Sequence, residues 1–495
     1  MLASTRRTAF SALAIAVCFS ADAVRAAETP LDVRPNVIVI VVDDLRFDEF
    51  GAAGHPYLET PNIDRLAAEG ATFLDGIHAV PLCSPNRASI MTGQYPSRHG
   101  VLDNIARDLR SHQLATFPQA LQAAGYETGF LGKWHMGNDA TPRPGFDFWS
   151  AFPGQGKTID PELFEDGRLH KVKGYITDLL TDRAIDFIRK ERNVPFMLYI
   201  GHKAVHPDSR QLDDGSVDPD YPRGYIPAPR HLGVYEDEIF PRRPNVVTSA
   251  DALEGKPALR RSLALRDSPP MSEAYGFMLD HGTSEETIRR RAEMVLSVDE
   301  SLGRIIEALV DQGQLDDTMI VFTSDNGFFF GEHWLSQERR MPYEESVRMP
   351  LLVRYPPLAK PGSLVEGLVM SIDIAPTVLD AGGAEIGAHI QGRSMLPLLR
   401  GDGNDWRKSV LVEFYTHENP RPWLMDMDYR AVRTEGYKLI HWIQHPDEEE
   451  LYDLRSDPYE MQNLVNDSEA QGVLKALRAE LALLAVEALG LPAAR

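Results

Sequence analysis

The chain has 495 residues, of which 25% are charged, and its formal net charge is −22 at pH 7. A chain of this length exceeds one hydrophobic core, so two or more structural units are expected. The acidic excess argues against general binding of nucleic acid or of anionic membranes. Any site for a polyanion is therefore expected to be a local basic pocket.

Residues 1–27 have the pattern of a signal peptide. Arg6 and Arg7 precede an apolar stretch, and Val24-Arg25-Ala26 matches a small-residue cleavage site. No later apolar run is long enough to span a bilayer. The sequence therefore predicts an exported protein, periplasmic or secreted, with no membrane association once the signal is removed.

Two apolar runs, Val37–Val42 and Thr318–Thr323, are predicted to be parallel strands buried on both faces. Polar residues follow each run: Asp43 and Asp44 follow the first, and Asp325 and Asn326 follow the second. Ligands of open α/β sheets bind beyond the carboxyl ends of strands. Three carboxylates with one amide oxygen suit Ca²⁺ or Mg²⁺ rather than zinc. Either pair alone would be an ordinary turn.

The stretch that begins at Cys83 is the centre of the expected site. The other cysteine lies in the predicted signal peptide, so Cys83 has no intrachain disulfide partner. Ser84 as N-cap, Pro85 as first helical residue and Gly93 as the C′ residue predict a helix directly after the cysteine. A helix N-terminus favours an anion, and Arg87 can add a bidentate fork for a tetrahedral oxyanion. From these residues alone, a reactive cysteine and a buried apolar cysteine are equally consistent with the sequence.

Residues 125–135 are predicted to form another strand. Alternation along it places Lys133 and His135 on one face and Trp134 on the other. A cation beside an imidazole suits the binding of an oxyanion with proton transfer, whereas a solvated lysine beside a core-edge histidine is the ordinary alternative.

Residues 151–158 fit a permissive phosphate-loop pattern that ends in Gly156-Lys157-Thr158. That motif requires a hydrophobic strand before it and a helix after it. The flanking residues predict neither element, so nucleotide binding is not expected.

Pro195–Gly201 is a further predicted strand, and His202 and Lys203 after it are candidates for a pocket. The polar segment 208–284 is long enough to suggest a substrate-pocket insertion. Apolar spacing over Glu285–Leu309 predicts a helix that packs on the sheet.

The pattern changes from about Asp402 onward. Short strands are predicted at Ser409–Tyr415, Tyr429–Thr434, Tyr437–Trp442 and Glu450–Leu454, with a helix from about Ala470. These elements together predict a small antiparallel sheet with a C-terminal helix. The expected organisation is a catalytic domain over 28–401 and a C-terminal subdomain over 402–495.

Several separated motifs resemble one family. Cys83-x-Pro85-x-Arg87 with Met91-Thr92-Gly93 is similar to the signature of the formylglycine-dependent sulfatases, the type I sulfatases of the alkaline phosphatase superfamily. Lys133-Trp134-His135 and the segment 450–464 also resemble sulfatase patterns. The resemblance covers nearly all of the chain after the signal peptide. It implies the alkaline-phosphatase-like α/β fold, with a mostly parallel mixed sheet between helices and a smaller C-terminal α+β domain.

In that family the cysteine is oxidised to Cα-formylglycine by a formylglycine-generating enzyme. The catalytic residues implied by the resemblance are Cys83, Arg87, Lys133, His135, His206 and Arg339. The implied ligands of Ca²⁺, or of Mg²⁺ as the alternative, are Asp43, Asp44, Cys83, Asp325 and Asn326. Sulfatases usually have lysine where this chain has Arg339, and arginine offers a fork instead of a point charge. Arg340 is a rival for the same role.

The resemblance implies a sulfatase that hydrolyses a sulfate monoester on a small molecule or an oligosaccharide, with a sulfated polysaccharide or glycosaminoglycan sugar preferred. Two alternatives stay open. One is a phosphonate monoester or phosphodiester hydrolase with the same nucleophile motif. The other is a non-catalytic protein that binds sulfated glycans and keeps Cys83 unconverted.

Overall fold

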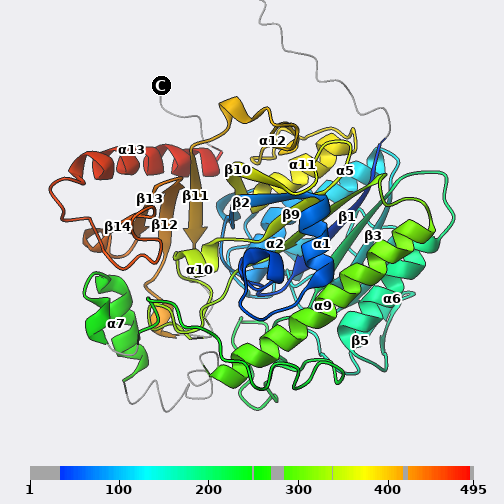
Figure 1. Cartoon of the computed structure of the whole chain (residues 1–495), viewed down its shortest axis with the longest axis horizontal. Helices are drawn as coiled ribbons and strands as arrows, with labels where there is room; N and C mark the ends of the chain where they lie inside the picture. The colour runs from blue at the N-terminus through cyan, green and yellow to red at the C-terminus, as the bar shows by residue number, and fades with distance from the viewer. Residues whose placement is uncertain (1–33, 248–249, 269–283, 337, 416–421, 491–495) are drawn as a thin grey trace, which may run out of the picture. The chain divides into compact units, whose positions relative to one another are not determined.

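Among the residues that the structure describes, a ten-stranded mixed sheet in the order β10-β2-β9-β8-β1-β7-β3-β4-β5-β6 forms the centre of the fold (Figure 1). The structure, a computed structural model, describes residues 34–247, 250–268, 284–336, 338–415 and 422–490. The predicted signal peptide lies outside this part. The strands of the sheet are β1 (Asn36–Val42), β2 (Ala71–Ile77), β3 (Glu127–Lys133), β4 (Phe148–Phe152), β5 (Glu162–Glu165), β6 (Arg168–Lys171), β7 (Phe196–His202), β8 (Thr318–Ser324), β9 (Leu351–Arg354) and β10 (Ser363–Met370).

The middle of this sheet is parallel, because β1 pairs in parallel with both β7 and β8, and β3 pairs in parallel with β7 and β4. Helices α1 (Pro61–Glu69), α6 (Ile176–Arg189) and α9 (Glu285–Asp311) pack together, and their apolar side chains share one core with Ile38 and Ile40 of β1. A second group of helices, α2 (Cys83–Thr92), α5 (Phe117–Ala123) and α11 (Ile374–Ala381), also packs together. Both faces of β1 are therefore buried, as its unbroken apolar sequence predicts.

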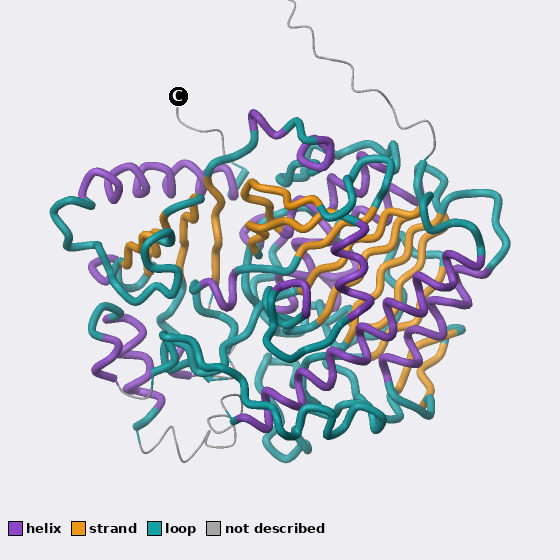
Figure 2. Tube along the Cα trace, viewed as in Figure 1, coloured by secondary structure: helices purple, strands orange, loops and turns teal. Residues whose placement is uncertain are grey.

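A separate four-stranded antiparallel sheet lies near the C-terminus of the described chain (Figure 2). It consists of β11 (Ser409–Phe414), β12 (Tyr429–Thr434), β13 (Tyr437–Trp442) and β14 (Glu450–Asp453), and α13 (Gln471–Ala488) packs on it. These elements confirm the predicted small sheet and helix, and the two sheets together confirm the predicted fold class. The domain boundary at residues 401 and 402 stays a prediction.

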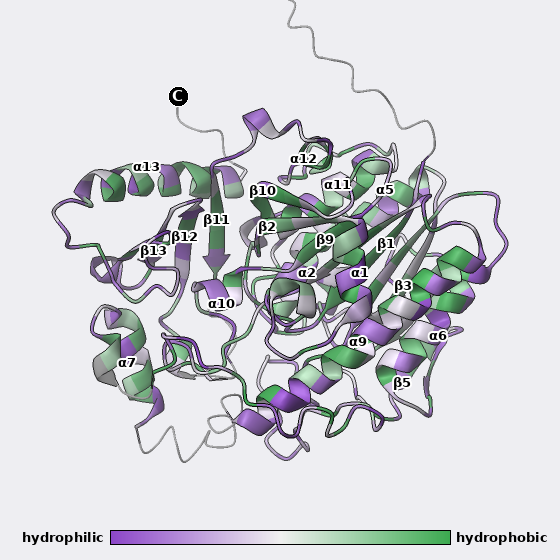
Figure 3. Ribbon diagram, viewed as in Figure 1, coloured by the Kyte–Doolittle hydropathy of each residue, from purple (hydrophilic) through white to green (hydrophobic). Residues whose placement is uncertain are grey.

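Short helices connect the strands, and apolar residues concentrate on the central strands (Figure 3). The remaining helical segments are η1 (Gly51–Ala53), α3 (Pro96–His99), α4 (Asp108–His112), η2 (Ala250–Leu253), α7 (Pro257–Arg266), α10 (Glu344–Val347), η3 (Ser371–Asp373), α12 (Leu396–Arg400), η4 (Gly403–Asp405), η5 (Pro422–Leu424) and η6 (Pro446–Glu448). In the described chain, none of the helices has both the length and the apolar content that crossing a bilayer requires.

Three local predictions need correction. Helix α2 begins at Cys83 itself, because Leu82 is the N-cap and its carbonyl accepts the first helical hydrogen bond, from Asn86 N–H at 3.0 Å. Pro85 is then the third helical residue, where a missing N–H still costs no helical bond. Strand β3 ends at Lys133, before the predicted end at residue 135. A strand, β4, does precede the phosphate-loop-like segment, but the next element is strand β5 rather than a helix.

Candidate active site

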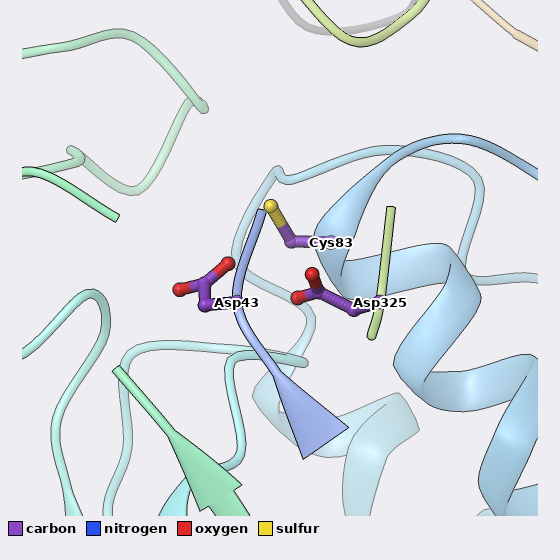
Figure 4. Close-up of side chains that lie close together, drawn as sticks. All are labelled: Asp43, Cys83 and Asp325. Carbon is purple, nitrogen blue, oxygen red and sulfur yellow. The ribbon is translucent and has the colours of Figure 1, made fainter. Parts of the chain in front are cut away.

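Three side chains from separate parts of the chain converge where β1 and β8 end (Figure 4). Ligand atoms of Asp43, Cys83 and Asp325 all lie within 4.8 Å of one another, and all three residues are buried. The parallel register, which pairs Val42 with Ser324, brings the residues after both strands to the same edge. The first turn of α2 supplies the cysteine. The predicted convergence at the carboxyl ends of the strands is thus observed.

Asp44 and Asn326 join this group through direct hydrogen bonds. Asp44 has a left-handed backbone, with φ of 58°, and its N–H donates to Asp325 Oδ1 at 3.0 Å. Asn326 Nδ2 donates to Asp44 Oδ1 at 2.7 Å. The segments after β1 and β8 therefore hold each other in place. They bring four of the predicted metal ligands together: Asp43, Asp44, Asp325 and Asn326.

The donor set fits a hard divalent cation. Asp43 Oδ1 and Asn326 Oδ1 are buried and accept no hydrogen bond within the described part of the chain. A buried oxygen without a partner costs free energy unless something else satisfies it. Carboxylate and amide oxygens are what Ca²⁺ binds, and the alternative Mg²⁺ takes oxygen ligands as well. The orphaned oxygens are therefore what a cation would satisfy.

Each of the three aspartates is paired with a different cation. Lys133 Nζ contacts Asp43 Oδ2, Arg87 Nη2 lies 2.7 Å from Asp325 Oδ2, and Arg339 Nη1 lies 3.2 Å from Asp44 Oδ2. Burial raises the pKa of Asp43 and nearby Asp325 adds to this effect, while Lys133 and Arg87 oppose it. These charges balance one another, and the three cations concentrate positive charge beside Cys83.

Cys83 is a free, buried cysteine at the first residue of α2. Burial raises the pKa of its thiol far above the ordinary value, although Lys133 and Arg339 act in the opposite direction. The thiolate is the nucleophilic form of cysteine, so this side chain as it stands is a poor nucleophile at neutral pH.

His206 lies between a backbone carbonyl and Arg339. Its Nδ1–H donates to Pro207 O at 2.7 Å, because a carbonyl can only accept, and Arg339 Nη2 donates to its Nε2 at 3.2 Å. Burial lowers the pKa of His206 well below the usual value, and Lys133, Arg339 and Lys203 lower it further. The ring is therefore neutral and presents a lone pair at Nε2.

His135 reaches the same site by a different geometry from the predicted one. β3 ends at Lys133, and His135 has a φ of 60°, so strand alternation does not extend to it. The turn brings its Nδ1 to 3.3 Å from Ser84 Oγ, next to the cysteine. Trp134 instead enters an aromatic cluster and donates from Nε1 to Ser111 Oγ at 2.6 Å. Burial, then Lys133 and Arg87, lower the pKa of His135 well below its usual value.

The weaker candidates have structural contacts. Lys203 Nζ donates to Pro207 O at 3.0 Å and lies 3.2 Å from Asp208 Oδ1. Arg340 Nη1 lies 3.2 Å from Glu338 Oε1, whereas Arg339 contacts Asp44 and His206. His202 is buried, and burial lowers its pKa to about 4. Arg339 thus contacts two site residues, Asp44 and His206.

Sequence reasoning missed Arg291, which lies on α9 and is fully buried. Its Nη2 donates to Asp44 O at 2.7 Å and to Glu49 Oε2 at 2.7 Å. A charged residue within the apolar stripe that includes Ile288 and Val295 was the available signal. Helix α9, which was predicted only to pack on the sheet, therefore also holds the backbone of Asp44 through Arg291.

A pocket of about 870 Å³ adjoins this group and is lined by residues 153–157 and 209–213. It lies beside His135, because Gln211 from its wall accepts a hydrogen bond from His135 Nε2 at 2.9 Å. The charged residues that line it are Lys157, Lys171 and Arg210 on the basic side and Asp160, Glu162 and Asp213 on the acidic side. Part of the predicted 208–284 insertion thus lines a pocket, although residues 248–249 and 269–283 lie outside the described chain. No sequence motif marks Gln211, and Gln155 occupies a variable position of the phosphate-loop-like segment 151–158.

Comparison with protein families gives two matches along the chain. The family described as Sulfatase matches residues 35–384. The family described as N-sulphoglucosamine sulphohydrolase, C-terminal, matches residues 331–487. The first match contains all of the converging residues described above.

Individual relatives are also similar over most of their length. N-acetylglucosamine-6-O-sulfatase from Bacteroides thetaiotaomicron is 36% identical over 493 residues, which cover 88% of this chain and 83% of the relative. Human N-acetylglucosamine-6-sulfatase is 30% identical, covering 77% of this chain and 67% of the relative. A solved structure of a protein in complex with its substrate D-glucosamine-2-N,6-O-disulfate has 33% identity and a TM-score of 0.78, covering 92% of this chain and 98% of that one.

Proposed function

The chain belongs to the sulfatase family and is a sulfuric ester hydrolase, and on that basis we propose that it removes the 6-O-sulfate from a glucosamine sugar of a sulfated polysaccharide. The names of two relatives specify this position on N-acetylglucosamine, and the substrate in the similar solved structure is a 6-O-sulfated glucosamine. The structural observation that supports a reaction centre for this proposal is the convergence of Asp43, Cys83 and Asp325 within 4.8 Å, beside three cations.

The proposed nucleophile is Cα-formylglycine, made from Cys83 by a formylglycine-generating enzyme. The protonated, buried thiol supports this proposal, because it is unsuited to attack sulfur itself. Once hydrated, the aldehyde would supply one hydroxyl to attack sulfur and a second whose deprotonation expels sulfate and restores the aldehyde. Two easier steps would replace one difficult displacement.

The proposed metal is Ca²⁺, with Mg²⁺ as the alternative, held by Asp43, Asp44, residue 83, Asp325 and Asn326. The orphaned oxygens of Asp43 and Asn326 support this assignment. When bound, the cation would supply positive charge to the nucleophile and to a sulfate oxygen.

Arg87, Lys133 and Arg339 are proposed to neutralise the sulfate oxygens. Preorganised cations in a buried site stabilise developing charge more strongly than in water, because the local dielectric is low. All three are at least nine-tenths buried. They are already fixed by their aspartate partners, so little reorganisation is needed when the anion arrives.

His206 is proposed to take up a proton at its free Nε2 when the substrate binds and to pass this proton to the leaving oxygen. His135 is proposed to take the proton from the second hydroxyl of residue 83. In the ligand-free protein, nearby cations help to keep both rings neutral. An anionic sulfate in the site opposes that effect, so substrate binding itself raises the basicity of His206. The neutral His135 is ready to accept a proton.

We further propose that the protein is exported, to the periplasm or outside the cell, after loss of residues 1–27. The catalytic domain is proposed to span 28–401 and the C-terminal subdomain 402–495. The signal pattern and the start of the small sheet at Ser409 support these two proposals.

The decisive experiment measures free sulfate released from N-acetylglucosamine 6-sulfate by protein co-produced with a formylglycine-generating enzyme. N-acetylgalactosamine 4-sulfate and a phosphonate monoester serve as competing substrates, and Cys83→Ala is the matched inactive control. We expect sulfate release from the 6-sulfate only, and a formylglycine mass in the peptide that contains residue 83. Faster turnover of the phosphonate ester, or an unmodified cysteine in fully active protein, would overturn the proposal.

A further inference from the structure

Gln211 fixes the protonation pattern of His135. Its Oε1 can only accept, so the 2.9 Å contact places a proton on His135 Nε2 and leaves Nδ1 as the free base. Gln211 Nε2 donates to Gly215 O at 2.8 Å, so the amide cannot be reversed without losing this bond. Nδ1 is the ring nitrogen on the side of Ser84, the residue that follows Cys83. Gln211 thus holds the tautomer that a proton acceptor beside residue 83 needs.

Gln155 continues this chain of contacts into the pocket. Its Nε2 donates to the same Gln211 Oε1 at 3.0 Å, and its side chain lines the pocket. The residue is only 6% exposed, and its buried Oε1 accepts no hydrogen bond in the described part of the chain. A buried acceptor without a partner costs free energy, and turning the amide of Gln155 toward the pocket that this residue lines would let a donor on a ligand satisfy it.

The character of the pocket indicates which part of a substrate it holds. The lining residues include equal numbers of basic and acidic side chains, while the cations that face Cys83 lie outside this lining. Its volume of about 870 Å³ is large enough for a sugar ring. A neutral polar group that carries hydroxyl or amide N–H donors fits such a wall better than a second sulfate does.

We propose that Gln155 binds a hydroxyl or amide N–H of the sugar that carries the reacting sulfate, and that Gln211 couples this contact to His135. The inference rests on the proposed function and names the residues that link sugar recognition to proton transfer. Gln155 is a specificity residue, because it touches the substrate. Gln211 is a positioning residue, because it acts through His135.

The test is steady-state kinetics of formylglycine-containing enzyme on N-acetylglucosamine 6-sulfate. Gln155→Leu is expected to raise KM about tenfold with kcat within about twofold of wild type, because it removes one hydrogen bond to the bound sugar. Gln211→Leu is expected to lower kcat about tenfold to a hundredfold, because His135 loses its tautomer. In the double variant the KM effect of Gln155→Leu shrinks, since Gln155 has lost its anchor.

Gln312→Leu is the matched control, because Gln312 is exposed at the end of α9 and outside the pocket. If a leucine variant melts at a lower temperature than this control, the asparagine variant at the same position, Gln155→Asn or Gln211→Asn, is used instead. The change at Gln155 is again expected to affect KM, and the change at Gln211 to affect kcat. Gln211→Glu keeps the acceptor and is expected to retain a higher kcat than Gln211→Leu.

The inference is overturned if the Gln155 and Gln211 variants match Gln312→Leu in both parameters, or if their effects are strictly additive. These outcomes are distinct from failure of the proposed function. If the proposed function is wrong, the wild-type enzyme itself releases no sulfate from N-acetylglucosamine 6-sulfate. If only this inference is wrong, the wild-type enzyme still releases sulfate.

Discussion

Arg339 donates a hydrogen bond to His206, with Nη2 3.2 Å from Nε2, and the same guanidinium reaches Asp44 Oδ2 through Nη1 at 3.2 Å. One side chain therefore connects the proposed proton donor with a proposed metal ligand. A lysine ammonium is a compact point charge and cannot reproduce both directions of the guanidinium fork. This arrangement gives a physical role to a position where sulfatases usually have lysine.

Replacing Arg339 tests this role. Arg339→Ala is expected to lower kcat/KM for a sugar sulfate by roughly 10²- to 10³-fold, the typical effect of removing one group that stabilises developing charge. Arg339→Lys should retain more activity than alanine, because it keeps the charge. Arg340→Lys is the matched control and should stay near wild type, since Arg340 pairs with Glu338. A larger loss of activity from the Arg340 variant would show that Arg340, and not Arg339, has this role.

Removing the cation proposed for this site is expected to destabilise the folded protein. Buried oxygens of Asp43 and Asn326 would lose the proposed partner, and ligand binding at 100 times Kd contributes about 2.7 kcal/mol to the free energy of unfolding. Thermal melting with EGTA and then with added Ca²⁺ or Mg²⁺ measures this effect. Asp44→Asn should reduce the Ca²⁺-dependent shift, and Asp402→Asn, an exposed residue, should not. Identical melting in chelator and in Ca²⁺ would exclude a resident cation.

The thiol of unconverted Cys83 is expected to resist alkylation. The residue is fully buried, and burial raises the pKa of its thiol, so thiolate is scarce and inaccessible. Protein produced without the formylglycine-generating enzyme should react with iodoacetamide slowly when folded and quickly in urea. Mass spectrometry of the peptide that contains residue 83 measures the extent of this reaction. Rapid labelling of folded protein would show that Cys83 is reachable and ionised.

Lys438 is expected to be a strong determinant of stability. Its Nζ lies 2.7 Å from Glu344 Oε1 and 2.8 Å from Glu460 Oε1, and all three residues are buried. Lys438→Met removes the cation that the two buried carboxylates share, and in the described part of the chain only Glu344 keeps another contact of this kind, with Arg433 Nη2 at 3.4 Å. The free energy of unfolding should therefore fall by about 3–5 kcal/mol in urea denaturation. Lys408→Met is the exposed control. A loss below about 1 kcal/mol, as for a surface ion pair, would contradict this expectation.

His99 is expected to make folding stability depend on pH. Its Nδ1 accepts a hydrogen bond from Val101 N–H at 3.1 Å, and burial lowers its pKa to about 3. Between pH 6.5 and 3 the unfolded chain binds a proton at this residue and the folded protein does not, so stability falls as pH falls. This contribution changes by about 1.4 kcal/mol per pH unit.

The measurement is urea denaturation from pH 7 to pH 5 for wild type and His99→Gln. The variant should have the shallower pH dependence in this range, whatever its absolute stability. Equal slopes for the two proteins would mean that His99 titrates normally in the folded state.

Local sequence was sufficient to predict the main elements. The β-branched run of β1, the apolar spacing of α9 and the strands β12 and β13 form where they were predicted, because each buries an unbroken or periodic apolar surface. Errors fell at element ends. Cys83 entered the helix because Leu82 capped it, and the turn at His135 broke the alternation that Lys133 suggested.

The sequence by itself determined the residue types of the site: the acids after two buried strands, the one cysteine beyond the predicted signal peptide, and the cations and histidines in recognisable motifs. Each of these signals is local, since a strand or a helix start is decided by a few neighbouring residues. Only the tertiary structure decided which cation pairs with which aspartate, that Arg339 rather than Arg340 reaches His206, and that Gln211 and Gln155 extend from His135 into a pocket. Those relationships join residues that are distant in the chain, and they depend on strand register and on how loops pack, which no short sequence pattern encodes.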